Sequence, residues 1–212
     1  MTTQQRVDDL PLSVIAEAAL RIVDADGPDA LTFRALGTAL GTSHMRIHRA
    51  VGSLDGLLDL CVDHLAEQLH VTDPDLPWTQ GTETRFIAFY QLLAGHPGLV
   101  ALRRGRPWLS PQILARLVEP SLAANRRAGM TRRQAVDAYR QMYLFTLGST
   151  AFVDHLNPRQ AQQQTRTALA SLDPEDYPEL TESRETIVQA VVDHEVYYSG
   201  LRHLIVAVAP QR

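Results

Sequence analysis

The chain has 212 residues, which is long enough for one sizeable core or two small ones. Its net charge of -4 does not by itself suggest a nucleic-acid partner. A hydrophobic content of 45% with only 6% aromatic residues favours helices packed on helices over a β-rich fold. The single cysteine, Cys61, excludes an internal disulfide framework and a CxxC metal site, which is typical of a reducing cytoplasm. We expect Cys61 to be a buried small hydrophobic group.

The amino terminus, MTTQQRVDDLPLS, contains no apolar signal core, and no apolar run approaches about 18 residues without a charge. We therefore expect a cytoplasmic protein that makes no contact with a membrane. All 20 basic side chains are arginine, which can form bidentate contacts that lysine cannot.

The first predicted helix runs from about residue 11 to residue 26, where Gly27-Pro28 ends it. Two short helices separated by a tight turn are predicted next, between Leu31 and Val51. Thr32 is a suitable N-cap for the first, Gly41 supplies a left-handed residue at its end, and Ser43 can cap the second. This order is typical of a helix-turn-helix, whose second helix enters a DNA major groove.

Local charge supports DNA binding by this segment. No Asp or Glu occurs from Ala30 to Leu54, whereas arginines and histidines lie on the expected outer side of the second helix. A surface without carboxylates suits a polyanion, because each neutralised phosphate releases counterions. The alternative is a small hairpin that only packs a core, but such a hairpin has no need of exposed arginines and histidines.

Arg46 is the best candidate for reading bases, because a guanidinium can bond bidentately to guanine O6 and N7, which is worth roughly 1–3 kcal/mol of discrimination. His44 and Met45 come next. Phosphate contacts fix the register without reading sequence, and the residues placed to make them are Thr32, Thr42, Ser43 and His48.

The remainder of the chain is also predicted to be helical, which makes the fold class all-α. Residues 1–53 are expected to form the DNA-binding domain, and residues 54–212 a second domain. The expected helices of the second domain cover about residues 54–71, 79–95, 110–128, 132–155, 159–172 and 186–209, with a single turn near 99–102 and a loop at 173–180.

With these residues placed, the chain resembles the tetracycline-repressor (TetR) family of transcriptional regulators. The resemblance covers IAEAALRIVDADG, LTFRALGTALGTS and RIHRAVGSLDGLLDL, and continues in FTLG at 145–148, LDPEDYPEL at 172–180 and YYSGLRHLIVAV. It implies a homodimer with an N-terminal DNA-binding domain and a C-terminal domain for dimerisation and for a small-molecule effector. The helices that start near Arg132 and Thr186 would form the dimer bundle, although their apolar stripes could instead be buried within one subunit. A two-fold dimer requires an inverted-repeat operator.

The chain departs from the family pattern in the DNA-binding segment. The family usually has Tyr, followed by His or Tyr, around positions 48 and 50, where this chain has His48 and Ala50. It usually has a phosphate-contacting Lys where this chain has Leu54, and Arg49 could replace that contact.

The effector site is expected among aromatic and polar groups of the middle helices, although ordinary core packing explains most of them equally well. The resemblance implies a ligand contact for His70 and for Phe89, whereas Arg85 replaces an Asn of the tetracycline repressor. No His occurs from Gly98 to Pro107, where that repressor has its metal ligand, so a magnesium-tetracycline effector is disfavoured. Arg85 and Arg104 would suit an anionic or carbonyl-rich ligand if they do not simply face solvent. The other candidates are Phe86, Tyr90, Trp108, Tyr139, Met142, Tyr143 and Thr146.

No catalytic or cofactor motif is found: HExxH, a P-loop, GxSxG and a glycine-rich dinucleotide loop are all absent from the sequence. The sequence therefore predicts no enzyme, no cofactor and no metal site. It favours a ligand-responsive repressor that a small molecule releases from its operator. The alternatives are a small-molecule-binding helical dimer whose DNA binding is weakened or lost, and, least favoured, an all-helical enzyme.

Overall fold

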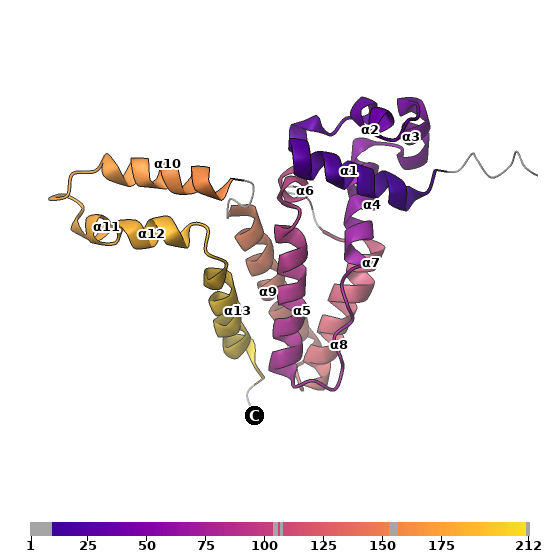
Figure 1. Cartoon of the computed structure of the whole chain (residues 1–212). Coiled ribbons are helices and arrows are strands. Elements are labelled where there is room, and N and C mark those ends of the chain that lie inside the picture. The colour runs from indigo at the N-terminus through magenta and orange to yellow at the C-terminus, as the bar shows by residue number, and fades with distance from the viewer. Residues whose placement is uncertain (1–9, 104–105, 107, 153–156, 211–212) are drawn as a thin grey trace, which may run out of the picture. The chain divides into compact units, whose positions relative to one another are not determined.

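A computed structural model of the chain describes residues 10–103, 106, 108–152 and 157–210. Every regular element in this part of the chain is helical (Figure 1), which confirms the all-α prediction. None of these helices combines the length and the apolar composition needed to span a bilayer. The chain divides into two compact units: unit 1 comprises Met1–Val71 and Gly95–Ser121, and unit 2 comprises Thr72–Ala94 and Leu122–Arg212.

Unit 1 is built on the packing of α1 (Leu12–Asp26) against α4 (Leu54–Ala66), with α2 (Phe33–Ala39) and α3 (His44–Val51) between them in the chain. A 3-10 turn, Pro28–Ala30, connects α1 to α2. Ile15, Ala19 and Val23 of α1 are buried, whereas Leu12 at its start is 49% exposed. Cys61 of α4 is 1% exposed, which confirms its assignment to the core.

The later segment of unit 1 contains α6 (Pro97–Leu102), α7 (Pro111–Ile113) and a π-helical turn, Leu114–Val118, that leads into α8 (Glu119–Arg127). Hydrogen bonds attach this segment to α4 and the residues after it. The Asp63 carboxylate accepts from the Gln112 backbone N–H at 2.9 Å, and the Arg116 guanidinium donates to the Leu69 carbonyl at 3.2 Å.

Unit 2 has a core of three mutually packed helices, α5 (Trp78–Ala94), α9 (Arg132–Phe152) and α13 (His194–Val208). A second group consists of α10 (Pro158–Ala170), α11 (Pro178–Glu182) and α12 (Arg184–Ala190), in which α10 and α12 lie side by side (Figure 1).

Three sequence-based boundaries were wrong. The predicted helix 186–209 is two helices, because the Asp193 side chain caps α13 by accepting from the Glu195 backbone N–H at 2.8 Å. The predicted loop 173–180 contains the start of α11. The helix predicted to reach residue 71 ends at Ala66. The end of the predicted helix 132–155 is not tested, because residues 153–155 lie outside the described residues. The proposed domain boundary after Ser53 concerns function and stays a prediction, although α4 belongs to the same compact unit as α3.

Candidate nucleic-acid interface and effector site

The predicted helix-turn-helix is formed by α2, a tight turn and α3. The Thr32 hydroxyl accepts from the Ala35 backbone N–H at 3.1 Å, so it is the N-cap of α2. The Ser43 hydroxyl accepts from the Arg46 backbone N–H at 3.3 Å and caps α3. Both capping assignments made from the sequence are confirmed.

A Schellman motif ends α2 and sets the direction of the turn. Gly41 has a φ of 61°, its N–H donates to the Thr38 carbonyl at 3.3 Å, and the Thr42 N–H donates to the Gly37 carbonyl at 2.9 Å. The turn passes so close to α2 that a Cβ atom at Gly37 would lie 2.9 Å from the Thr42 carbonyl oxygen. Glycine at position 37 therefore allows α3 to pack closely against α2.

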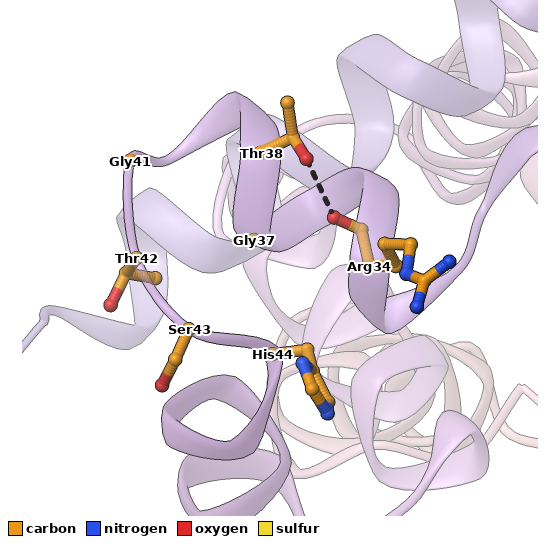
Figure 2. Close-up of a pocket in the computed structure, with 7 residues that line it drawn as sticks. All are labelled: Arg34, Gly37, Thr38, Gly41, Thr42, Ser43 and His44. Carbon is orange, nitrogen blue, oxygen red and sulfur yellow. Dashed lines mark hydrogen bonds between the residues drawn. The ribbon is translucent and has the colours of Figure 1, made fainter.

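An open hollow of about 430 Å³ lies on the outside of this turn. In Figure 2, the side chains of Thr42, Ser43 and His44 extend from one side of the turn, whereas Thr38 points away and its hydroxyl donates to the Arg34 carbonyl at 3.1 Å. The residues that line the hollow are Arg34, Gly37, Thr38, Gly41, Thr42, Ser43 and His44, and none of them is acidic.

One face of α3 is buried and the other is available for contact. Ile47 is fully buried, Met45 is 56% exposed, and the side chains of His44, His48 and Arg49 are also exposed. Arg46 is half-buried, and Thr42 is half-buried as well, whereas Thr32 and Ser43 are exposed. The ring of His48 packs edge-on against Phe33, with ring centroids 5.3 Å apart. The roles assigned to these residues on DNA stay predictions.

The structure brings together seven of the predicted effector residues in the core of unit 2. The rings of Phe89 and Tyr143 stack with centroids 6.0 Å apart, and those of Phe86 and Tyr139 are 6.2 Å apart. All seven side chains are at most 7% exposed; they are Phe86, Phe89 and Tyr90 of α5 and Tyr139, Met142, Tyr143 and Thr146 of α9.

Tyr197 of α13 lies at the polar centre of this core and was not among the predicted site residues. Its hydroxyl lies 2.9 Å from the Thr146 hydroxyl and donates to the Phe86 carbonyl at 3.0 Å, while its ring stacks on Tyr90 at 3.8 Å. The Tyr90 hydroxyl in turn lies 2.8 Å from Nδ1 of His194. Burial raises the pKa of Tyr90 to about 12. In the sequence, Tyr197 is one member of an apolar stripe, and only its hydroxyl distinguishes it.

Arg85 is buried in unit 2, which contradicts the alternative that it simply faces solvent. Its side chain is 6% exposed, and its Nε and Nη1 atoms have no hydrogen-bond partner among the described residues. Burial, with a smaller contribution from the positive charge of Arg127, lowers the pKa of Arg85 to about 10, so the guanidinium remains charged at neutral pH.

The remaining effector candidates do not belong to this core. His70 is exposed and Trp108 is buried, and both are in unit 1, where the Trp108 ring lies 5.8 Å from the Arg103 guanidinium. Arg104 lies outside the described residues. Within the described part of the chain, no group of three or more His, Cys, Asp or Glu side chains is arranged to hold a metal ion.

The described chain is all-α, with a capped helix-turn-helix and a separate helical unit whose core is aromatic and polar. This architecture is that of helix-turn-helix regulators with a C-terminal regulatory domain. The family model "Tetracyclin repressor-like, C-terminal domain" matches residues 72–209. The chain therefore belongs to the tetracycline-repressor family.

Individual relatives agree with this assignment. The HTH-type transcriptional repressor DrrR1 of Streptomyces coeruleorubidus is 29% identical to this chain over 160 residues. The match covers 74% of this chain and 57% of DrrR1, so it reaches little more than half of that relative's length. The Streptomyces coelicolor TetR family protein ActR, in complex with (S)-DNPA, has the same fold, with a TM-score of 0.76 and 24% identity over 94% of this chain and 96% of ActR. BioQ, solved with its double-stranded DNA operator, has a TM-score of 0.60 and 26% identity over 74% of this chain and 93% of BioQ.

Proposed function

We propose that this protein is a ligand-responsive transcriptional repressor that binds an inverted-repeat operator as a homodimer and is released by a small molecule. The observation that carries the proposal is the outer surface of α3, where exposed His44, Met45, His48 and Arg49 lie in a segment without any acidic residue from position 30 to 54. The naming of DrrR1 as a repressor and the DNA operator bound to BioQ support this function. We infer no catalytic role, and we propose a cytoplasmic location.

On DNA, α3 is the recognition helix and its N-terminal side chains meet the bases. Arg46, with His44 and Met45, reads base edges in the major groove. The exposed hydroxyl of Ser43 accepts a backbone hydrogen bond, and its own hydrogen remains available for a phosphate oxygen. Further phosphate contacts are assigned to Thr32, Thr42, His48 and Arg49.

The effector site is the core of unit 2, formed by α5, α9 and α13. A small molecule releases a repressor only if it binds more tightly to a conformation that fits the operator poorly. The complex of ActR with (S)-DNPA supports a small-molecule site in this family, and the aromatic and polar side chains of the unit 2 core suit such a ligand. Residues 1–53 are thus proposed as the DNA-binding domain and residues 54–212 as the effector and dimerisation domain.

The experiment that tests this function is selection of a binding site from random duplex DNA, followed by gel-shift titration of the selected site. We expect an inverted repeat, and we expect Arg46→Ala to reduce discrimination between bases by roughly 1–3 kcal/mol at one position of each half-site. Arg21→Ala, in α1, is the control for loss of one positive charge in the same unit. Unchanged discrimination by Arg46→Ala would refute the assignment of α3 as the reading helix.

A second function is favoured by two positions of the DNA-binding segment. Ala50 and Leu54 are both exposed where relatives of the family usually have polar or cationic side chains, and Leu54 is 41% exposed. On this basis the alternative is a small-molecule-binding helical dimer with weakened or lost DNA binding. Salt titration separates the two, because a DNA-binding protein loses affinity steeply as salt rises, with a slope set by the number of phosphates contacted.

A further inference from the structure

Two arginine side chains are buried in the described part of the chain, and only one of them has an acidic partner. Arg103, in unit 1, is 5% exposed and forms an ion pair with Asp59. Arg85, in α5 of unit 2, is 6% exposed and has no such pair among the described residues. A buried charge is unfavourable unless it is paired, so packing alone does not explain Arg85.

None of the other charged groups described in unit 2 forms an ion pair with Arg85. The charged group that acts on it most strongly is another cation, Arg127, whose positive charge adds to the effect of burial in lowering the Arg85 pKa. The positive charge of Arg85 is therefore available to an anion that enters from outside the chain. The acidic groups of unit 2 for which the described residues show an ion pair bind other arginines: Glu83 and Glu195 with Arg202, Asp137 with Arg133, and Glu185 with Arg166.

Two further buried donors are also without partners. Thr82 is 1% exposed and Tyr139 is 7% exposed, and neither hydroxyl has a hydrogen-bond partner among the described residues. Thr82 and Arg85 are three residues apart in α5 and so share one face of that helix. Burial raises the pKa of Tyr139, so its hydroxyl stays protonated and can donate a hydrogen bond.

The packing of α5 on α9 places these donors near one another. Asn125 accepts from the Trp78 indole N–H at 2.8 Å and donates to the Ala135 carbonyl at 2.9 Å, which fixes residue 78 of α5 near residue 135 of α9. One or two turns further along both helices, Phe86 packs against Tyr139. Thr82 and Arg85 lie between these two levels of α5.

We propose that the effector is an aromatic compound carrying one ionised acidic group, such as a carboxylate, which accepts hydrogen bonds from Arg85, Thr82 and Tyr139. The rings of Phe86, Phe89 and Tyr143 provide apolar surface beside these donors for the aromatic part of the ligand. The inference rests on the proposed effector site in unit 2, and it assigns the chemical class of the ligand.

The test compares pairs of probes that share a shape and differ in charge: 2-naphthoate with 2-naphthamide, and benzoate with benzamide. Calorimetric titration of the full-length protein is expected to show at least about tenfold tighter binding of a carboxylate than of its amide, because hydrogen bonds between ionised groups are stronger. Arg85→Gln should abolish this preference. Arg133→Gln, which removes an exposed α9 arginine paired with Asp137, should keep it.

Thermal unfolding without any probe provides a second readout. Since Arg85 is an unpaired buried charge, Arg85→Gln should unfold at the same or a higher temperature than the unsubstituted protein, and carboxylate probes should no longer raise its Tm. The inference is overturned if no carboxylate of the panel binds more tightly than its amide, if Arg85→Gln retains the preference, or if Arg85→Gln lowers the Tm of the free protein markedly.

Operator binding separates this inference from the proposed function. If gel shifts show a sequence-specific operator complex but the anion preference is absent, only the ligand class is wrong. If no duplex DNA is bound specifically at low salt, the repressor function is wrong, whatever the probes show at Arg85.

Discussion

Gly37 is a helical position where a larger residue would meet backbone atoms. Its Cβ would lie 2.9 Å from the Thr42 carbonyl oxygen and 3.2 Å from the His44 nitrogen, and neither atom can move without shifting the turn. We expect Gly37→Ala to destabilise the protein by about 1–3 kcal/mol, although alanine is the better helix former. Urea unfolding followed by circular dichroism measures this change, and weaker operator binding should accompany it because α3 is displaced.

The same substitution at Gly81 is the matched control. Gly81 is also buried and helical, but its Cβ would lie 3.6 Å from the nearest atom, Leu76 Cβ, which is ordinary van der Waals contact. Gly81→Ala should therefore leave stability unchanged or raise it by up to about 1 kcal/mol. Equal destabilisation at both positions would mean that the close approach at Gly37 is not the cause.

Cys61 should be chemically inert while the protein is folded. Burial, the largest cause, raises the pKa of the Cys61 thiol from 9.0 to about 12. At about pH 9, where an exposed thiol is half ionised, the reactive thiolate of Cys61 is therefore scarce. Because the folded pKa is the higher one, the stability contributed by the neutral thiol is complete below about pH 9 and declines as the pH rises towards 12. Alkylation at pH 9, followed by mass spectrometry with and without urea, should modify only the unfolded chain; rapid modification without urea would contradict this.

The residues that the sequence identified and those it missed differ in what determines them. Thr32, Gly41 and Ser43 act on backbone groups within a few residues, so their roles as caps and turn residue follow from local sequence. The sequence named Arg85 as an effector candidate without settling whether it is buried, and it missed Tyr197; both features depend on what surrounds these side chains in three dimensions. Helix packing leaves Arg85 buried without an ion pair among the described residues, and it brings the Tyr197 hydroxyl to Thr146 and Phe86. No local sequence pattern reports either arrangement.

At the scale of elements, the break between α12 and α13 shows where periodicity misleads. Apolar residues continue through Val191 and Val192, so a hydrophobic stripe alone favours one helix across this segment. The structure ends α12 at Ala190 and starts a new helix at His194, because Asp193 offers its carboxylate to the exposed N–H of Glu195. A capping residue inside an apolar repeat is therefore the better signal of a helix boundary.

Asn125 joins three helices, and removing it should loosen their packing. Its amide accepts from Trp78 of α5 and donates to the Ala135 carbonyl of α9, and it is 1% exposed. Asn125→Ala removes both hydrogen bonds, the one from the half-buried Trp78 indole and the one to the carbonyl of buried Ala135, so we expect a loss of about 1–3 kcal/mol in the free energy of unfolding, on top of any loss of packing.

A double-mutant cycle with Trp78→Phe isolates the hydrogen bond between Asn125 and the indole. If this bond is favourable, Asn125→Ala should cost less in the Trp78→Phe background than alone, and the difference is the coupling energy, measured by urea unfolding. Additive effects of the two substitutions would show that the bond contributes no stability.

At the scale of the whole molecule, the proposed repressor requires two copies, and unit 2 offers apolar surface for that contact. Val136 and Leu144 of α9 are 48% and 51% exposed, and Val196 and Val206 of α13 are 57% and 73% exposed. Exposed apolar residues are ordinary when they occur singly. Here four of them occur on two helices that pack against each other. The family resemblance assigns the dimer contact to α9 and to the predicted helix 186–209, of which α13 is the later part.

Charged side chains on this surface should separate the two copies without unfolding either. We expect Leu144→Arg combined with Val206→Arg to convert a dimer to a monomer in light scattering, with unchanged circular dichroism, because both positions are exposed within one copy. A monomer holds one half-site at a time, so operator affinity should fall by about 100-fold or more, the effect of losing a linked second contact. Leu114→Arg, at a 46% exposed position of unit 1, is the control and should remain dimeric. If the doubly substituted protein stayed dimeric and bound the operator normally, the two copies would have to meet through another surface, and the assignment of α9 and α13 to the dimer contact would be wrong.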